Sequence, residues 1–409
     1  MVYFIVLALI LFCIYAYDYK RKSVGDLVMY VGICVFMICI AGLRYRIGGD
    51  SVGYENEFQN IPTLSSIGTF KFNTIRWEPG FIYFMSLSKS IIPDFTFFQF
   101  LHATIINSII FWFIYKNTSN KYLAVCFYFV CLFLDFNTEV LRESIAVCIF
   151  LLAWPFFKRG NWIIYYLLVF CATFFHLSSL LTFLFPIFAI PGIRQMFRLG
   201  YRTIFICLIL FGISLVLGKT FFTLIQAMSV NETVTERAMM YASSRSYGAM
   251  VLNVFGMMDS VVKNIFIPIC AVWYLRKTLT KDEDSKEVKD FLKMEIIVMT
   301  GVYISVLGLV IFILQRFTNY TNIFAYVFMA SCFFKTAQLK RKKKFKLAGS
   351  YWFCIFIIVM ALNFKGYFAN TYGSQTYRRY MLYYPYYSRL DHTEDPNREQ
   401  ILRFGSHIK

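Results

Sequence analysis

Arginine and carboxylate side chains gather in one short, glycine-rich stretch near the start of the chain. Residues 44–54 read RYRIGGDSVGY and bring together Arg44, Arg46 and Asp50. A guanidinium is planar and permanently charged, and it binds phosphate oxygens through two parallel hydrogen bonds. Glycine lets the backbone turn and approach a ligand closely. These residue types predict a loop that binds an anion, and the alternative is a flexible loop with solvated charges.

Other ionisable residues stand at the ends of apolar runs, where a charge inside a membrane is costly. Arg142 opens the apolar run LRESIAVCIFLLAW, and a basic residue is unfavourable at a helix start unless an anion is near. Glu78 ends the polar segment after Arg44, His176 lies within FFHLSSLL, and Arg316 lies within LQRFTNY. Each also has an ordinary interpretation. Arg142 and Arg316 would serve as anchors at the lipid interface, and His176 as a hydrogen-bonded structural residue.

The composition identifies the elements that must position these side chains. Of the 409 residues, 58% are hydrophobic, 20% are aromatic and only 16% are charged, whereas a soluble domain carries about a quarter charged residues. Several apolar blocks reach the roughly 20 residues that a spanning helix needs. We therefore expect an all-α, polytopic integral membrane protein whose backbone hydrogen bonds are satisfied inside helices.

The net charge of +18 does not indicate nucleic acid, because the lysines and arginines lie mostly in short loops between apolar blocks. This distribution follows the rule that positive loops stay in the cytoplasm. The eleven cysteines lie in apolar blocks without paired spacing and are expected to be buried as small hydrophobic residues. No His, Cys and carboxylate grouping has metal-ligand spacing, so we expect no metal and no cofactor.

The charges also predict a topology of about twelve spans with both ends outside. The expected domains are a single multi-span membrane domain, 1–363, and an outer tail rich in Tyr and Arg, 364–409. Outer loops are expected at 44–78 and 226–259. The short apolar segment 79–93 must enter and leave on the same side, which predicts a re-entrant or interfacial helix. In this topology the unusual ionisable residues lie at the outer face: Arg44, Arg46, Asp50, Glu78, Arg142, Glu143, His176 and Arg316.

Five motifs follow one another in the chain: RYRIGGDSVGYENEF, WEPGFIYFMSL, RESIAVCIFLLAW, FFHLSSLL and QRFTNY. Their residues and order resemble the EpsG-like family, bacterial polysaccharide polymerases of the Wzy type. The resemblance runs from about Arg44 to Tyr320. Family members commonly have Gly-Thr-Asp or a similar triplet where this chain has Gly48-Gly49-Asp50, and the aspartate is retained.

The resemblance implies a multi-pass glycosyltransferase of the bacterial cytoplasmic (inner) membrane with a glycosyltransferase C-like multi-span fold. Such polymerases move a growing glycan from undecaprenyl diphosphate onto the next lipid-linked oligosaccharide repeat unit at the outer face. The implied partners are these lipid-linked oligosaccharides, membrane lipids, a chain-length regulator and a flippase, and no nucleic acid.

These expectations combine into a mechanistic hypothesis. Four arginines would bind the lipid diphosphate and stabilise the charge that grows on it as the glycosidic bond breaks; they are Arg44, Arg46, Arg142 and Arg316. Three residues could act as base for the acceptor hydroxyl, and the sequence does not choose among them; they are Asp50, Glu78 and His176. Because arginines supply the positive charge, no metal is required.

Three alternatives stay open at the level of sequence. A transporter or flippase for lipid-linked sugars would also need a cationic cavity, but it should show inverted repeats and broken helices, and the sequence shows neither. A ligase of the O-antigen type has nearly the same chemistry as a polymerase. A structural scaffold would not need several charged sites on one face.

Overall fold

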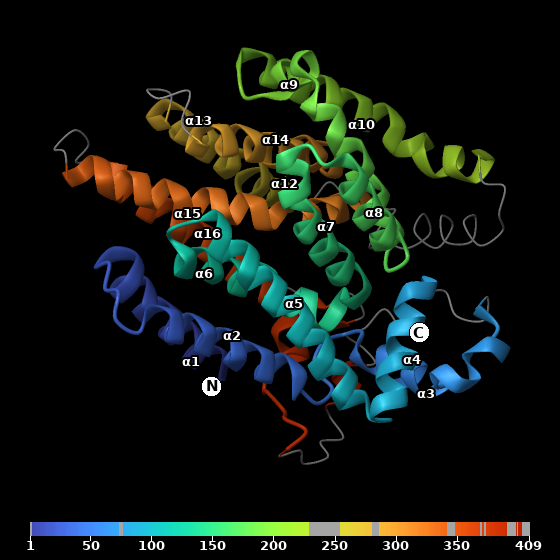
Figure 1. Cartoon of the computed structure of the whole chain (residues 1–409). Helices are drawn as coiled ribbons and strands as arrows, with labels where there is room; N and C mark the ends of the chain where they lie inside the picture. The colour runs from blue at the N-terminus through green and yellow to red at the C-terminus, as the bar shows by residue number, and fades with distance from the viewer. Residues whose placement is uncertain are drawn as a thin grey trace. The chain divides into compact units, whose positions relative to one another are not determined.

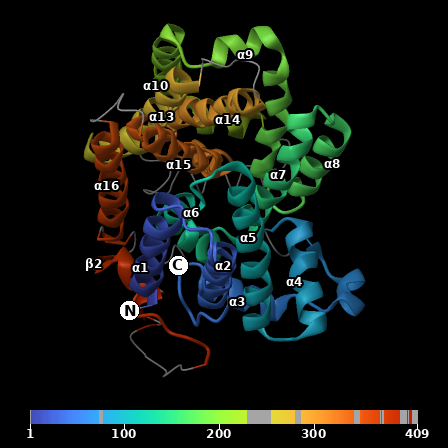
Figure 2. The ribbon, with the colours of Figure 1, turned by 60° about the vertical axis from the view of Figure 1, so that its left-hand side comes forward.

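A computed structural model describes residues 2–72, 77–228, 254–279, 286–341, 348–368, 370–371, 374–390, 398 and 400–402. The chain divides into two compact units, Met1–Phe183 with Thr336–Lys409, and Leu184–Lys335. The described residues are almost entirely helical, which confirms the all-α class (Figures 1 and 2). Most of the expected outer loop 226–259 and the basic residues 342–344 lie outside the described residues.

The first unit contains nine α-helices and a small sheet among its described residues. Helix α2 lies along α5, and α7 packs against α8 (Figure 1). The helices are α1 Val2–Cys13, α2 Asp26–Gly42, α3 Ser51–Asn60, α4 Pro79–Ile91, α5 Phe95–Asn117, α6 Lys121–Cys131, α7 Leu141–Arg159, α8 Trp162–Thr173 and α16 Ala348–Tyr367. Strands β1 Asn370–Thr371 and β2 Ser374–Arg378 pair antiparallel. Short 3-10 or π segments cover Ile14–Tyr19, Leu64–Thr69, Asp135–Glu139 and Arg379–Leu382.

The second unit is built around α14, whose apolar part is largely buried. Glu295 on this helix is fully buried and accepts a hydrogen bond from Leu199 N at 3.2 Å. The guanidinium groups of Arg198 and Arg276 lie 3.8 and 3.9 Å from its carboxylate. The elements of this unit are α9 Pro191–Phe197, α10 Tyr201–Met228, α12 Val254–Ser260, α13 Ile267–Leu279, α14 Lys286–Gly308 and α15 Asn319–Arg341, which ends in the first unit, with a π segment Val261–Phe266 and a 3-10 helix Phe312–Thr318.

Four helical segments among the described residues are long and apolar enough to cross a membrane. They are Val2–Tyr19, Phe95–Asn117, Met257–Thr278 and Asp290–Gly308, and a fifth arises if the bent pair Leu177–Phe188 and Pro191–Phe197 forms one span. Shorter apolar helices cover Asp26–Gly42, Lys121–Cys131, Trp162–Thr173, Tyr201–Val216 and Trp352–Tyr367. Membrane-spanning lengths are therefore present, and the total of about twelve spans stays a prediction.

Two expected spans are less regular than their hydropathy indicates. The expected span 122–137 changes character after Cys131, because α6 ends there and a π segment begins at Asp135. The expected span 178–191 is a 3-10 helix, Leu177–Ala189, that contains Pro186. Proline removes a backbone donor and clashes with the preceding turn, which disfavours a regular α-helix. Hydropathy alone does not record either interruption.

Helix α4 occupies the expected re-entrant segment. Its 13 residues correspond to about 20 Å at about 1.5 Å per residue, which is shorter than the roughly 30 Å hydrocarbon layer. The helix packs against α5 and the 3-10 turn Leu64–Thr69. Its length agrees with a segment that does not span, and its position in the membrane stays a prediction.

Buried polar side chains on α5 fix the place where α7 begins. His102 Nε2 lies 3.0 Å from Leu141 O and 3.2 Å from Ser144 Oγ. Five residues further along the helix, Asn107 Nδ2 donates to Asn137 Oδ1 at 3.0 Å. Buried polar groups without partners are costly, so these bonds specify one arrangement of α5 and the segment before α7. The start of α7 carries Arg142, and α5 therefore positions that arginine.

Candidate functional site

The glycine-rich stretch 44–54 is held by the C-terminal tail of the chain. Tyr45 N donates to Tyr387 O at 2.9 Å, and Arg389 N donates to Leu43 O at 2.8 Å, which forms a short antiparallel bridge. Gly48 N donates to Leu382 O at 3.0 Å. The tail expected at 364–409 thus pairs with the loop that carries the first candidate residues.

Apolar contacts and a buried arginine reinforce this pairing. Ile47 packs with Leu382, Tyr383 and Leu402 in a buried cluster. Arg398 is 4% exposed and its Nε donates to Arg46 O at 3.0 Å. Arg46 has a φ of 48°, a left-handed conformation that is uncommon for a residue other than glycine. The tail therefore stabilises an unusual backbone turn at a candidate residue.

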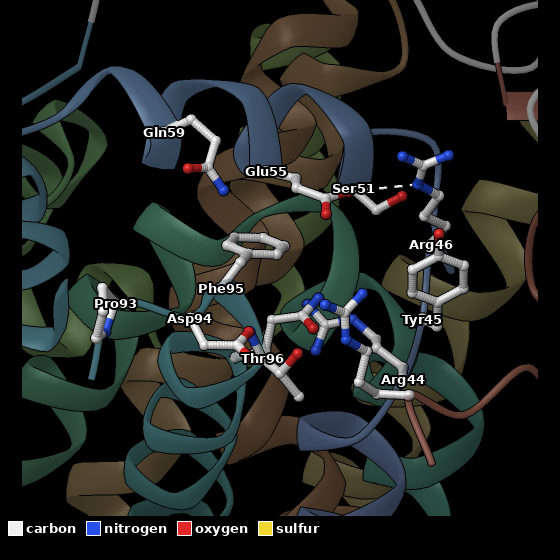
Figure 3. Close-up of a pocket in the computed structure, with 12 residues that line it drawn as sticks. Arg44, Tyr45, Arg46, Ser51, Glu55, Gln59, Pro93, Asp94, Phe95 and Thr96 are labelled. Atoms are coloured by element: carbon white, nitrogen blue, oxygen red, sulfur yellow. Dashed lines mark hydrogen bonds and ion pairs between the residues drawn. The ribbon is translucent and has the colours of Figure 1, made fainter. Parts of the chain in front are cut away.

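Arg44 and Arg46 line one cavity of about 190 Å³ (Figure 3). Arg44 is 3% exposed, and its Nη1 donates to Ala41 O at the end of α2. Burial lowers the pKa of Arg44 to about 10, so the group stays charged at neutral pH. Arg46 is more exposed and pairs with Glu55 Oε2 at 3.4 Å. The full lining is Arg44, Tyr45, Arg46, Ser51, Glu55, Gln59, Pro93, Asp94, Phe95, Thr96, Gln99 and Arg389.

Asp50 precedes α3 and contributes its backbone to a carboxylate-binding turn. Gly49 N donates to Glu139 Oε1 at 2.7 Å, and Asp50 N donates to Glu139 Oε2 at 3.2 Å. Tyr383 OH adds a third bond to Glu139 Oε1 at 2.9 Å. Burial, followed by the charge of Asp50, raises the pKa of Glu139 to about 7. The Asp50 and Glu139 carboxyl groups therefore share one electrostatic environment near neutral pH.

Gly48 allows this close approach. Its φ is 96°, and a Cβ atom there would lie 2.5 Å from Thr138 Cβ. Glycine reaches such a conformation without the steric cost that other residues meet. The backbone of the turn before α3 is consequently packed directly against the Thr138 side chain, in the segment before α7.

Arg142 and Glu78 form an ion pair at the start of α7 and α4. Arg142 Nη1 lies 2.7 Å from Glu78 Oε2, with the two side chains 23% and 13% exposed. The guanidinium also lies over the Trp77 ring, 5.7 Å from its centroid. Arg142 Nε is buried and has no hydrogen-bond partner. A buried, unpartnered donor on a fixed cation is the kind of group that a ligand oxygen satisfies.

Tyr54 on α3 connects the two groups of candidate residues. Its hydroxyl donates to Glu139 O at 3.2 Å, and its ring lies 5.1 Å from the Trp77 ring. Burial raises the pKa of Tyr54 to about 12, while the neighbouring Arg142 charge acts in the opposite direction. A continuous set of contacts therefore runs from the Asp50 turn through Glu139 and Tyr54 to Arg142.

His176 lies beside the Arg142–Glu78 pair. Leu177 N, the next residue in the chain, donates to Glu78 Oε1 at 3.4 Å. Gly80 N donates to Phe174 O at 2.8 Å, so the start of α4 is fixed against the end of α8. The His176 Nδ1 atom accepts a bond from Ser178 N at 3.2 Å. Nδ1 is thereby used as an acceptor, and a neutral ring then carries its proton on Nε2.

The structure brings six of the seven predicted site residues into the first unit. The seventh, Arg316, belongs to the second unit and lies in the 3-10 helix Phe312–Thr318. Its predicted role in binding the same diphosphate stays a prediction.

Sequence analysis missed three residues that the structure adds to this region. Glu139 lies at the end of a short polar interruption, DFNTE, between apolar runs. Tyr54 ends the glycine-rich stretch, and its residue type alone did not indicate a role. Arg389 lies in the tail, more than 340 positions from Arg44, and no local pattern connects them. Of the three, only Glu139 had a local signal, because a carboxylate between two apolar runs is costly.

Comparison with known proteins places the chain in a family. No group of three or more His, Cys, Asp or Glu side chains suited to a metal occurs among the described residues. No curated protein and no solved structure matches the chain. The chain does match the EpsG family over residues 27–388, which is most of its length, and it therefore belongs to this family of polysaccharide polymerases.

Proposed function

We propose that the protein is a membrane glycosyltransferase that polymerises lipid-linked oligosaccharide repeat units. The growing glycan moves from undecaprenyl diphosphate onto a sugar hydroxyl of the next lipid-linked unit, at the outer face of the bacterial cytoplasmic membrane. Family membership supports the polymerase chemistry, and the apolar helices support a membrane location.

The reaction breaks the bond between the sugar C1 and the diphosphate oxygen. The acceptor hydroxyl oxygen forms the new bond to C1, its proton passes to a base, and undecaprenyl diphosphate leaves with the electron pair. The leaving group gains negative charge as the bond breaks. Fixed cations close to that oxygen lower the barrier, because they interact more strongly with the transition state than with the substrate.

Arg142 is the observation that carries the proposal. Glu78 and Trp77 hold its guanidinium in place, and its buried Nε has no partner. A preorganised cation needs no rearrangement when charge develops on the leaving oxygen. Arg44 and Arg46 belong to the glycine-rich stretch that Tyr54 links to Arg142. They supply further positive charge for a diphosphate.

The contacts also divide the three candidate bases. Both oxygens of Glu78 are engaged, one by Arg142 and one by Leu177 N, so Glu78 acts as a positioning residue for Arg142. His176 uses Nδ1 as an acceptor, and its remaining role is donation from Nε2. Asp50 stays a candidate base. Both oxygens of Glu139 accept hydrogen bonds, from Gly49 N, Asp50 N and Tyr383 OH, so Glu139 acts as a positioning residue for the turn at Asp50.

The test is polymerisation of undecaprenyl-diphosphate-linked repeat units by the purified protein, with glycan length as the measurement. The wild-type protein should convert single units into polymer, and Arg142→Ala should leave single units. Arg202→Ala is the matched control, because Arg202 is exposed and its Nε donates to the hydroxyl of the neighbouring Tyr201. A wild-type protein that moves lipid-linked units across a bilayer without lengthening them would make the protein a flippase and overturn the proposal.

A further inference from the structure

The C-terminal tail adds a third arginine to the cavity that Arg44 and Arg46 line. Arg389 belongs to the segment whose backbone pairs with Leu43–Tyr45. The centroid of the Tyr45 ring lies 5.4 Å from the guanidinium group of Arg46 and 5.5 Å from that of Arg389. The aromatic face favours cations, so the ring attracts two arginines that line the cavity, of which Figure 3 labels Arg46 beside Tyr45.

The cavity contains more positive than negative charge. Its three arginines are accompanied by two carboxylates, Glu55 and Asp94. Glu55 pairs with Arg46, and Asp94 accepts a hydrogen bond from Thr96 N at the start of α5. Within the part of the chain that the structure describes, Arg44 and Arg389 have no ion-pair partner.

Arg44 contributes the strongest reason for a ligand. Its side chain is almost fully buried, and its Nε has no hydrogen-bond partner. A buried guanidinium with an unsatisfied donor and no carboxylate is costly unless an anion occupies the neighbouring space. The adjacent cavity of about 190 Å³ is smaller than the roughly 300–1,000 Å³ of pockets that hold drug-sized molecules. It fits an anionic head group and is too small for an oligosaccharide.

We propose that the C-terminal tail completes a phosphate-binding pocket in which Arg389 and Arg44 hold the phosphate groups of a lipid-linked ligand. The chemistry is that of a phosphate ester head group, supplied either by the diphosphate of a lipid-linked sugar or by a membrane phospholipid. The assignment of the ligand as the diphosphate of a lipid-linked sugar rests on the proposed function. Arg142 and Glu78 are not among the residues that line this pocket, and the role proposed for Arg389 is in binding the head group.

Binding of inorganic diphosphate to the purified full-length protein in phospholipid-free detergent tests this inference. Arg389→Ala should weaken the affinity about tenfold or more, since charge-assisted hydrogen bonds to phosphate are strong. Arg389→Lys should recover part of it, because lysine keeps the charge and loses the two-pronged geometry. Arg378→Ala is the matched control, since Arg378 lies on the exposed side of the same tail and does not line the cavity.

A second variant changes the affinity in the opposite direction, which a folding defect would not do. Glu55→Gln removes a negative charge from the cavity and releases Arg46, so it should tighten diphosphate binding a few fold. Unchanged affinity in Arg389→Ala together with no gain in Glu55→Gln would overturn the inference. The two sources separate by competition: undecaprenyl diphosphate displaces the probe if substrate is the ligand, and phosphatidylglycerol in nanodiscs displaces it if a phospholipid is.

The same preparations separate this inference from the proposed function. Diphosphate binding that depends on Arg389, in a wild-type protein that makes no polymer, would leave the pocket standing and remove the polymerase assignment. If the wild-type protein makes polymer and its diphosphate affinity does not depend on Arg389, the polymerase assignment would stand and the pocket would be removed.

Discussion

Arg142 Nη1 lies 2.7 Å from Glu78 Oε2, although the two residues are 64 positions apart in the chain. Both side chains are mostly buried, so each charge depends on the other for compensation. An arginine that serves only as an anchor at the lipid interface would extend its charge into water. The pair instead gives Arg142 two roles, stabilising the start of α4 and presenting a fixed cation.

Arg142→Ala should abolish most polymerisation and also lower stability. Each lost hydrogen bond to phosphate is worth about 1.5–3 kcal/mol, and a rate falls about tenfold for each 1.4 kcal/mol. Arg142→Lys should restore activity only in part. The measurement is glycan length at a protein level matched by immunoblot. Full-length polymer at normal abundance from Arg142→Ala would reduce Arg142 to an anchor.

A double variant separates the two roles of Arg142. Arg142→Ala leaves the buried Glu78 carboxylate without its partner, whereas Arg142→Ala with Glu78→Gln leaves no uncompensated charge. The double variant should therefore melt closer to the wild-type protein and remain inactive. Recovery of polymerisation along with stability would show that the arginine is structural.

Gly80→Ala should destabilise the junction between α4 and α8. A Cβ atom at Gly80 would lie 2.6 Å from Phe174 O, so the chain must shift and the bond from Gly80 N would weaken. Overpacking of this kind costs about 1–3 kcal/mol. The control is Gly68→Ala, where no atom lies within 4 Å of the added carbon. The melting temperature should fall for Gly80→Ala and stay at the wild-type value for Gly68→Ala. Equal melting temperatures in the two variants would contradict the packing argument.

Glu139 should make the protein more stable in mild acid than at neutral pH. Burial and the Asp50 charge raise the pKa of Glu139 from its ordinary 4.5 to about 7. A raised carboxyl pKa means that the folded state binds the proton more tightly. The stabilising contribution is therefore complete below about pH 4.5 and is lost as the pH rises through about 7. Melting temperatures across this window measure the effect.

Glu139→Gln is the comparison for that pH series. Glutamine cannot titrate, so the variant should lose much of the difference between mild acid and neutral pH, by about 2 °C or more in melting temperature. Asp50, Asp135 and the Tyr383 hydroxyl face the same carboxyl group and also shape its titration. Identical pH profiles for the two proteins would exclude Glu139 as the titrating group.

The topology prediction is tested by labelling cysteines from outside the cell. An impermeant thiol reagent should reach cysteines substituted at Asp50, His176 and Arg316, and should not reach one at Lys342. The reason is the basic charge near Lys342, which favours a cytoplasmic position. Labelling at Lys342 in intact cells would reverse the orientation.

The labelling needs one background control. The unsubstituted protein already contains eleven cysteines, of which Cys171 and Cys354 are exposed. Its signal must be subtracted before any substituted position is compared. Permeabilised cells, in which Lys342 becomes reachable, show that the reagent and the substituted cysteine react.

Hydropathy and charge predicted the helical class and the elements that carry the candidate residues. The helix at 97–115, for instance, is α5 at Phe95–Asn117, because a long apolar run has few alternatives to a helix. The interruption after Cys131 escaped notice. The π segment that follows it is held to α5 by a buried hydrogen bond from Asn107 Nδ2 to Asn137 Oδ1. Such bonds join residues that are distant in sequence, and local composition does not record them.

Most residues of the candidate site could be predicted from the sequence, but the contacts that join them in pairs could not. An arginine at a helix start indicated an anion, and the structure gives Arg142 a protein carboxylate, Glu78. Nothing in either motif specified the other as its partner. Arg389 and Glu139 show the same limit, because each becomes part of the site only through a contact made by the folded chain.

The pairing of the tail with the glycine-rich loop has a consequence for biosynthesis. Ribosomes make the loop at Arg44 long before the segment at Ser388, yet the two form one bridge. The arginine pocket is incomplete until the tail has been made, so the proposed binding of a phosphate head group must wait for the tail. A chain that stops after α16 would keep the helices described above and leave the pocket unfinished.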